Sequence, residues 1–269
     1  MEHTKKVPIL LVHGTWGNAW TWDFPGRSVM DYLAIRGYDV YALDLRGMGE
    51  SQRPDDYATI DLLDRVHDLV AVAGHIVETT GRRPVVTGWS QGALLTALMA
   101  AQTPELVAGV GLFGMPGNGY YIPPEFLPLI DEVIRSGVDR YVTSAEVTFA
   151  MVFAVDPVTG KPTINEEAFQ TYMEFCEPDS VNVTLQELST VYFQAVIAPV
   201  LPSIRVPALV ADGALAIGTG EERARALFDA LGSERKQLFI FPRNSHGWFL
   251  EDNSQATLRA FDRFLAEFK

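Results

Sequence analysis

A sharp change from an extended run to a helix-forming run most constrains how this chain can fold. Residues 84–95 read Pro-Val-Val-Thr-Gly-Trp-Ser-Gln-Gly-Ala-Leu-Leu, so a β-branched run ends in Gly-x-Ser-x-Gly and a helix-forming stretch begins at once. Ser90 on so tight a turn is held in strained backbone geometry, and Gly88 and Gly92 leave room where strand and helix approach. The pattern predicts a serine hydroxyl that projects above a sheet, backed by a helix N-terminus that favours negative charge. A glycine-rich turn with a serine N-cap is the alternative.

A second motif lies near the start of the chain. Residues 7–12 (Val-Pro-Ile-Leu-Leu-Val) have no polar face, which is typical of a strand buried on both sides in a parallel sheet. They run directly into His-Gly-Thr-Trp-Gly at residues 13–17. The glycine after the histidine lets the chain turn back, so that the N–H of Thr15 can point to the space above Ser90. The N–H of Gln91 is the expected second donor to an oxyanion there.

One of the five histidines is the candidate general base. The other four are assigned to a frayed terminus, to the turn after the first strand and to a charged amphipathic stretch: His3, His13, His67 and His75. His246 instead follows the strand-forming run 236–242 and precedes the C-terminal helix. A histidine at the carboxyl end of a strand, in a chain with such a serine, is expected to take the serine proton and return it to the leaving group.

Four motifs in this order resemble those of the α/β-hydrolase fold superfamily: His13-Gly14, Asp44-Leu45-Arg46-Gly47-Met48-Gly49-Glu50-Ser51, Gly88-Trp89-Ser90-Gln91-Gly92 and Ser245-His246-Gly247. The resemblance spans nearly the whole chain. It implies that Ser90 attacks a carbonyl carbon and that His246 shuttles the proton. It also implies an oxyanion hole formed by the N–H groups of Thr15 and Gln91.

The resemblance further implies an acid that orients His246, and here the sequence departs from the family pattern. The usual position is Gly-x-x-Asp shortly after the strand at 206–211, where this chain has Ala216. In a minority of the family the acid follows the preceding strand beyond a Met-Pro pair, where this chain has Asn118. A deliberate replacement of the usual acid by Ala216 is an alternative that the sequence leaves open.

Asp212, at the end of the strand itself, is the nearest remaining carboxylate and the provisional partner of His246. The structural alternative for Asp212 is a strand-end turn or a helix-dipole partner, and the sequence does not separate the two roles. Glu251 and Asp252 are weaker candidates, because acidic residues at such a point commonly begin a helix.

Short apolar runs alternate with helix-forming stretches along most of the chain, which predicts an α/β fold with a mostly parallel sheet of about six strands flanked by helices. Strands are expected at residues 7–12, 38–43, 84–87, 107–113, 209–211 and 238–241. Helices are expected at residues 26–36, 60–80, 91–102, 221–231 and 254–268. The two antiparallel strands that open full-length members of the superfamily are largely missing.

Between Phe113 and Val206 the alternation stops, and this stretch has no strand-forming runs. Helices are expected there at residues 124–136, 144–155, 165–177 and 185–197. Residues 1–114 and 203–269 are therefore expected to form the core, with residues 115–202 inserted as a helical lid. The lid is rich in aromatic residues and methionine, which predicts an apolar pocket between lid and sheet. Trp16, Trp89 and Asn118 are the expected pocket residues, and Trp89 alternatively packs beneath the turn.

Composition excludes several classes of partner. A net charge of −13 would repel nucleic acid and anionic lipid surfaces. No apolar run approaches the ~20 residues of a membrane helix. The first six residues lead directly into a strand, which is unlike a signal peptide, and the single Cys176 cannot form an internal disulfide. A cytoplasmic protein is expected, and a homodimer stays open. No histidines have metal-ligand spacing, so neither a metal nor another cofactor is expected.

These features together predict a serine hydrolase that cleaves an ester, lactone or related acyl bond of a small apolar molecule through an acyl-enzyme on Ser90. The missing acid leaves alternatives open, because the same fold hosts lyases, cyclases, cofactor-free oxygenases and receptors that do not hydrolyse their ligand. Epoxide hydrolases and dehalogenases are excluded, since their elbow needs a carboxylate.

Overall fold

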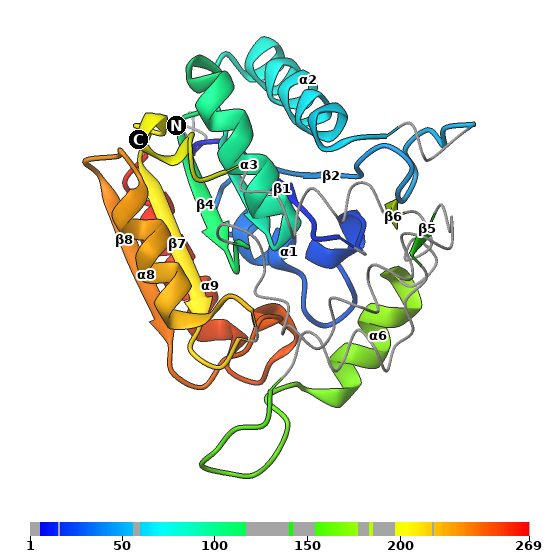
Figure 1. Cartoon of the computed structure of the whole chain (residues 1–269). Coiled ribbons are helices and arrows are strands. Elements are labelled where there is room, and N and C mark those ends of the chain that lie inside the picture. The colour runs from blue at the N-terminus through cyan, green and yellow to red at the C-terminus, as the bar shows by residue number, and fades with distance from the viewer. Residues whose placement is uncertain are drawn as a thin grey trace.

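Six strands form a parallel sheet in the order β2-β1-β3-β4-β7-β8 (Figure 1). The computed structural model describes residues 6–15, 17–55, 60–116, 154–176, 197–216 and 218–268, and the backbone of residues 140–141 and 183–184. The six strands are β1 (Ile9–Val12), β2 (Val40–Leu43), β3 (Val85–Trp89), β4 (Gly109–Phe113), β7 (Ala208–Gly213) and β8 (Lys236–Phe241). The prediction of a parallel sheet of about six strands is confirmed.

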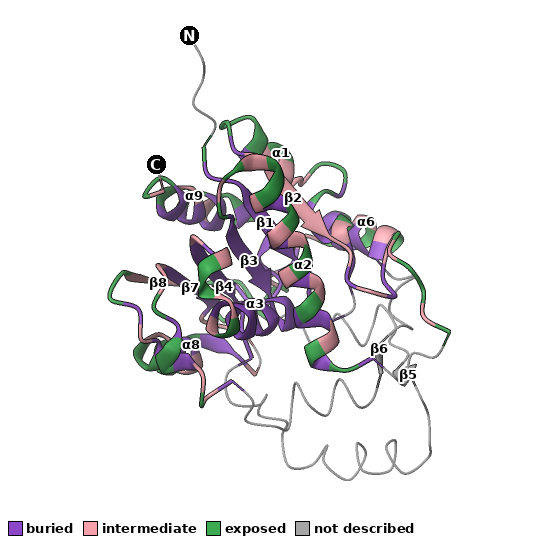
Figure 2. Cartoon of the chain, turned by 90° about the horizontal axis from the view of Figure 1, so that it is seen from above, coloured by how far each residue is buried: buried purple, intermediate pink, exposed green. Residues whose placement is uncertain are grey.

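Helices cover both faces of this sheet, as Figure 2 shows from above. On one face lie α1 (Val29–Ala34) and α9 (Ser254–Leu265), and on the other lie α2 (Leu62–Thr80), α3 (Gln91–Gln102) and α8 (Gly220–Ala230). The sheet therefore separates two apolar cores, one on each face.

Strand β1 shows how the sequence supplies both cores. Ile9 and Leu11 pack in the core with α1 and α9, whereas Leu10 and Val12 pack in the core with α2, α3 and α8. All four are fully buried, because successive side chains of a strand point to opposite faces. A strand covered on both sides has no polar face, which is why residues 7–12 read as one apolar run.

The helix ends follow their capping residues. Helix α2 begins with a capping box between Asp61 and Asp64 and ends at Gly81 in the left-handed region, close to the predicted bounds. Helix α1 is shorter than the predicted 26–36. The Ser28 side chain accepts the Asp31 N–H as N-cap, so Gly26 and Arg27 lie outside the helix.

The described residues also include four short 3-10 helices: η1 (Ala19–Trp22), η3 (Pro104–Leu106), η6 (Leu201–Ser203) and η7 (Trp248–Leu250). None of the helices in the described ranges is long and apolar enough to cross a membrane. Strand β1 lies between β2 and β3, so the direction of strand succession reverses there. Open α/β sheets bind ligands beyond the carboxyl ends of the strands at such a reversal.

The inserted segment is described only in part. Helix α6 (Glu166–Cys176) confirms the predicted helix at 165–177, and it packs against η1 and η7. The end of the predicted helix at 144–155 is wrong, since Val155 forms an antiparallel bridge with Pro162. The short strands β5 (Arg140–Tyr141) and β6 (Val183–Thr184) pair where only helices were expected. The predicted helix at 124–136 and residues 185–196 lie outside the described residues.

Candidate active site

Ser90 lies on the elbow that the motif predicts, between β3 and α3. Its backbone angles are φ 56° and ψ −124°, and it is the one non-glycine residue at positive φ among the described residues. Such a conformation costs about 1–3 kcal/mol and persists only where the surroundings enforce it. A Cβ on Gly88 would lie 2.1 Å from the Gly92 carbonyl carbon, so strand and helix meet with no room for a side chain.

The turn after β1 packs directly against this elbow. A Cβ on Gly14 would lie 2.8 Å from the Trp89 ring and 3.3 Å from the Ser90 Cβ. His13 holds the turn in place: its Nε2 accepts the Leu45 N–H at 3.3 Å, and its Nδ1 lies 2.7 Å from the Gly14 carbonyl oxygen. With Nε2 accepting, Nδ1 is the protonated nitrogen and donates to that carbonyl. His13 thus joins the turn after β1 to the segment that follows β2.

The two expected oxyanion donors lie on the two segments that meet at the elbow, the turn after β1 and the start of α3. Thr15 follows the glycine that touches the elbow, and its side chain is buried. Gln91 is the first residue of α3, so its N–H belongs to the helix start, where the helix dipole is positive. Both residues therefore lie at the carboxyl ends of β1 and β3, and their role as oxyanion donors stays a prediction.

His246 lies in the loop between β8 and η7 and is 4% exposed. The Trp89 indole Nε1 donates to the His246 carbonyl oxygen at 2.8 Å, and the two rings lie 5.2 Å apart between centroids. A Cβ on Gly114, after β4, would lie 2.8 Å from the His246 Nδ1. Burial lowers the pKa of the imidazole to about 4, so His246 is neutral at pH 7 and competent to accept a proton.

Trp89, which precedes Ser90 in the chain, contacts the loop of His246. It is buried, and its ring also packs edge-on against Phe249 at 4.8 Å. Trp89 therefore supports the histidine loop, and its role as a pocket residue stays a prediction. The other two expected pocket residues, Trp16 and Asn118, lie outside the described residues.

Asp212 and His246 share a neighbour that the sequence did not reveal, the side chain of Thr219. The Asp212 Oδ1 accepts the Gly213 N–H at 2.8 Å, and the carboxylate also receives hydrogen bonds from the Thr219 side chain and the Gly220 N–H. The Thr219 Oγ1 lies 3.5 Å from the His246 Nδ1. Burial raises the pKa of the Asp212 carboxyl to about 7, although these hydrogen bonds oppose the shift.

Glu251, the weaker candidate for the acid, binds the histidine loop at another point. Its Oε1 accepts both the N–H of Ser245 at 2.6 Å and the Ser245 hydroxyl. The carboxyl group is buried, and burial raises its pKa. Glu251 therefore fixes the residue that precedes His246. Asp252, the other weak candidate, is largely exposed and pairs with Arg27 and Asn165.

The inserted segment is joined to the same histidine loop. The Thr163 hydroxyl donates to the Ser245 hydroxyl at 3.0 Å. Two residues further on, the Asn165 N–H donates to the Leu250 carbonyl oxygen at 2.9 Å. Arg243, at the start of the loop, forms an ion pair with the buried Asp156. Polar contacts from residues 156–165 thus hold the loop before and after His246.

Replacing Glu251 with alanine is expected to destabilise the fold by about 2 kcal/mol, because the buried N–H and hydroxyl of Ser245 lose their acceptor. Urea denaturation measures the change. Asp252→Ala is the matched control, since the neighbouring carboxylate is exposed and its removal is expected to change the stability little. Equal midpoints for Glu251→Ala and the unaltered protein would contradict the role given to Glu251.

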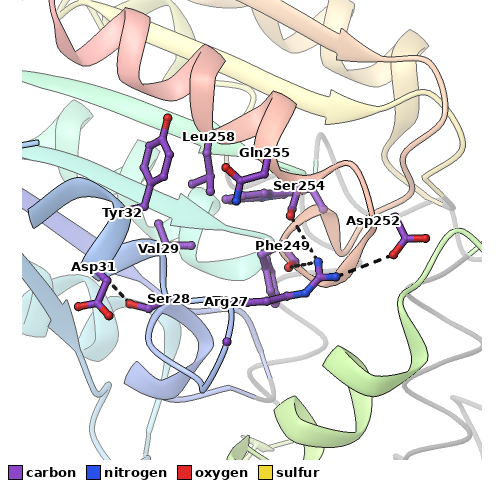
Figure 3. A pocket seen from close by; sticks show the side chains of 12 residues that line it. Arg27, Ser28, Val29, Asp31, Tyr32, Phe249, Asp252, Ser254, Gln255 and Leu258 are labelled. Carbon is purple, nitrogen blue, oxygen red and sulfur yellow. Dashed lines mark hydrogen bonds and ion pairs between the residues drawn. The ribbon is translucent and has the colours of Figure 1, made fainter. Parts of the chain in front are cut away.

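A separate pocket of about 550 Å³ lies behind the histidine loop, between α1, η7 and α9 (Figure 3). Its wall includes Trp248 and Phe249, which follow His246 closely in the chain. Arg27 lies on one side, where its guanidinium is 3.3 Å from the Ser254 hydroxyl and 3.9 Å from the Asp252 carboxylate (Figure 3). It also donates to the Glu251 carbonyl oxygen at 2.6 Å. Neither Ser90 nor His246 lines this pocket, so it is distinct from the catalytic arrangement.

Comparisons with known proteins agree with the fold. The model of the alpha/beta hydrolase family matches residues 9–260. A triacylglycerol lipase of Pseudarthrobacter phenanthrenivorans is 29% identical over 156 residues, which cover 55% of this chain and 44% of the lipase. The chain therefore spans less than half of the length of that relative.

Solved structures show the same fold at lower identity. A thermophilic esterase from Thermogutta terrifontis has a TM-score of 0.74 and 19% identity, covering 98% of this chain and 90% of the esterase. An enol-lactonase from Burkholderia xenovorans LB400 has a TM-score of 0.70 and 18% identity, covering 99% of this chain and 94% of the lactonase. Likeness at such identities establishes the architecture alone.

Proposed function

The chain belongs to the alpha/beta hydrolase family, and from this premise we propose that it hydrolyses carboxylic esters or lactones through an acyl-enzyme on Ser90. The observation on which the proposal depends is the strained conformation of Ser90 at the start of α3. Strain of this kind is retained at functional sites, because a relaxed turn would no longer present the hydroxyl above the sheet.

The proposed reaction uses only groups of this chain. The neutral His246 takes the Ser90 proton as the oxygen attacks the carbonyl carbon, and it then gives that proton to the leaving alcohol. The N–H groups of Thr15 and Gln91 stabilise the oxyanion of the tetrahedral intermediate. Water, activated by the same histidine, releases the acid and restores Ser90.

The names of the related proteins support the class of bond. They include a triacylglycerol lipase, an esterase and an enol-lactonase, all of which act on an ester or a cyclic ester. We take the substrate to be a small, neutral, apolar ester. Aromatic side chains beside the insertion support this choice, since Trp20 packs on Phe175 with ring centroids 4.7 Å apart.

The proposal is tested by covalent labelling combined with a panel of substrates. A fluorophosphonate probe is expected to label Ser90 alone, as mass spectrometry of the digested protein would show. Short aryl esters and a γ-lactone are expected to be hydrolysed by the same preparation. Labelling without turnover of any ester, lactone or thioester would instead support the second candidate, a receptor or a non-hydrolytic enzyme, which the alanine at position 216 favours.

The charge of the substrate is expected to matter strongly. A neutral diester should be hydrolysed at least about tenfold faster than the anionic half-ester of the same dicarboxylic acid, because an unpaired carboxylate is costly to bury. The comparison of kcat/KM is repeated at high salt. A preference that disappears with salt would assign the effect to the net charge of −13 rather than to the pocket. Faster turnover of the half-ester would contradict the apolar substrate.

A further inference from the structure

Thr219 occupies the N-cap position of α8 and yet does not cap the helix. A threonine there normally accepts an N–H of the first helical turn through its hydroxyl. The Thr219 side chain makes no such hydrogen bond, and it is 5% exposed. Its hydroxyl instead interacts with the carboxylate of Asp212 and lies 3.5 Å from Nδ1 of the His246 imidazole.

The chemistry of a hydroxyl determines the direction of these two contacts. A hydroxyl has one hydrogen to donate and two lone pairs to accept with. Asp212, when ionised, can only accept, so the single hydrogen of Thr219 goes to that carboxylate. The Thr219 oxygen is then left to accept from the Nδ1–H of His246, 3.5 Å away. This tautomer leaves Nε2 of the imidazole unprotonated, as a general base requires.

The other carboxylate near the histidine is turned elsewhere. Glu251 directs its Oε1 to the N–H and hydroxyl of Ser245, one residue before His246. Its effect on Asp212 is repulsive and helps to raise the pKa of that carboxyl. Ala216, in the slot where the family has its acid, offers only a methyl group. The Asp212–Thr219 pair is thus the acidic unit that the structure brings to Nδ1 of His246.

We propose that Thr219 is a positioning residue, whose hydroxyl links the buried carboxylate of Asp212 to Nδ1 of His246. The proposal rests on the proposed function, in which His246 must accept a proton from Ser90. The carboxylate acts through the hydroxyl on an imidazole that becomes positively charged in the transition state. This arrangement replaces the direct contact between an acid and a histidine that the sequence predicted for Asp212.

Substitutions of Thr219 and Asp212 test the link. Thr219→Val is expected to lower kcat for a short aryl ester by about 10²-fold with little change in KM, because the tautomer of His246 is no longer fixed. Thr219→Ser keeps the hydroxyl and is expected to recover most of that loss. Asp212→Asn is expected to lower kcat at least as much, and the double variant Thr219→Val with Asp212→Asn should be little worse than Asp212→Asn alone. Circular dichroism and the melting temperature show whether each variant folds, and Thr219→Ala replaces the valine variant if it does not.

The pH profile distinguishes the link from a merely structural role. Since the Asp212 carboxyl has a pKa of about 7, kcat/KM of the unaltered protein is expected to fall as the pH drops below 7. The imidazole, with a pKa of about 4, stays neutral over that range. In Thr219→Val and Asp212→Asn this decrease near pH 7 should disappear, because Asp212 no longer acts on His246. A structural defect would lower the whole profile and leave its shape unchanged.

Two results would overturn the proposal while leaving the proposed function intact. Full activity of Thr219→Val together with loss of activity in Asp212→Asn would show direct contact of Asp212 with the imidazole. Full activity of both variants, with Ser90→Ala inactive, would place the orienting group elsewhere. An active Ser90→Ala variant would instead overturn the proposed function itself.

Discussion

Ser90→Ala is expected to lower kcat for a short aryl ester by at least about 10³-fold, and to abolish labelling by a fluorophosphonate. The covalent route requires an oxygen nucleophile at the elbow, and alanine has none. The fold should survive, because the substitution removes one oxygen atom and the Ser90 side chain does not cap α3. Steady-state kinetics and the melting temperature check both parts of this expectation.

Ser233→Ala is the matched control. Ser233 is also a buried serine, with its hydroxyl bonded to the Arg235 carbonyl oxygen at 3.0 Å, and it lies just before β8, at the opposite end of the strands from Ser90. It should keep both labelling and turnover. Wild-type turnover in Ser90→Ala would exclude the acyl-enzyme, and loss of activity in both variants would point to a general defect of folding.

Gly92→Ala is expected to destabilise the fold by about 3 kcal/mol, even though alanine is the better residue in a helix. A Cβ at this position would lie 2.4 Å from the carbonyl oxygens of Val12 and His13. Both atoms are backbone at the end of β1, so the helix start or the strand must move. Because the same movement displaces Ser90 from the Thr15 turn, activity is expected to fall as well.

Gly74→Ala provides the control within the same protein. Gly74 lies in α2, and a Cβ there meets no atom within 4 Å. Alanine should therefore stabilise the protein by about 0.8 kcal/mol through helix propensity alone. Urea denaturation measures the change in unfolding free energy of both variants. Destabilisation by Gly92→Ala together with stabilisation by Gly74→Ala would assign the loss to the close approach at the elbow and not to helix propensity. Equal stabilisation by both substitutions would contradict the close approach.

The parts of the fold that follow from neighbours in the chain were predictable. The elbow requires Gly88 and Gly92 two residues to either side of Ser90, so its pattern is visible in the sequence. The buried strands are apolar runs, because helices cover both faces of the sheet. Short strands such as β5 and β6 have two residues each and therefore show no periodicity from which to predict them.

Contacts between segments that are distant in the chain could not be predicted from the local sequence pattern. Thr219 precedes a helix that begins with glutamates, which is an ordinary N-cap signature, and nothing local shows that its hydroxyl turns toward His246, 27 residues away. Asp212 was recognised only as the nearest carboxylate, and its role stays a prediction. Likewise, Thr163 and Ser245 are 82 residues apart, so their hydrogen bond depends on how the insertion folds back.

That hydrogen bond gives the inserted segment a part in holding the loop of His246. Thr163 and Asn165 support the loop of His246, and Arg243 of the same loop is paired with Asp156. An excised version of the protein, with the insertion cut out and the core rejoined, would keep its strained serine but lose part of what positions its base. Substrate range and catalytic competence are therefore not separately adjustable here. Under the proposed function, a change that remodels residues 156–165 to admit a new substrate also acts on the loop that holds His246.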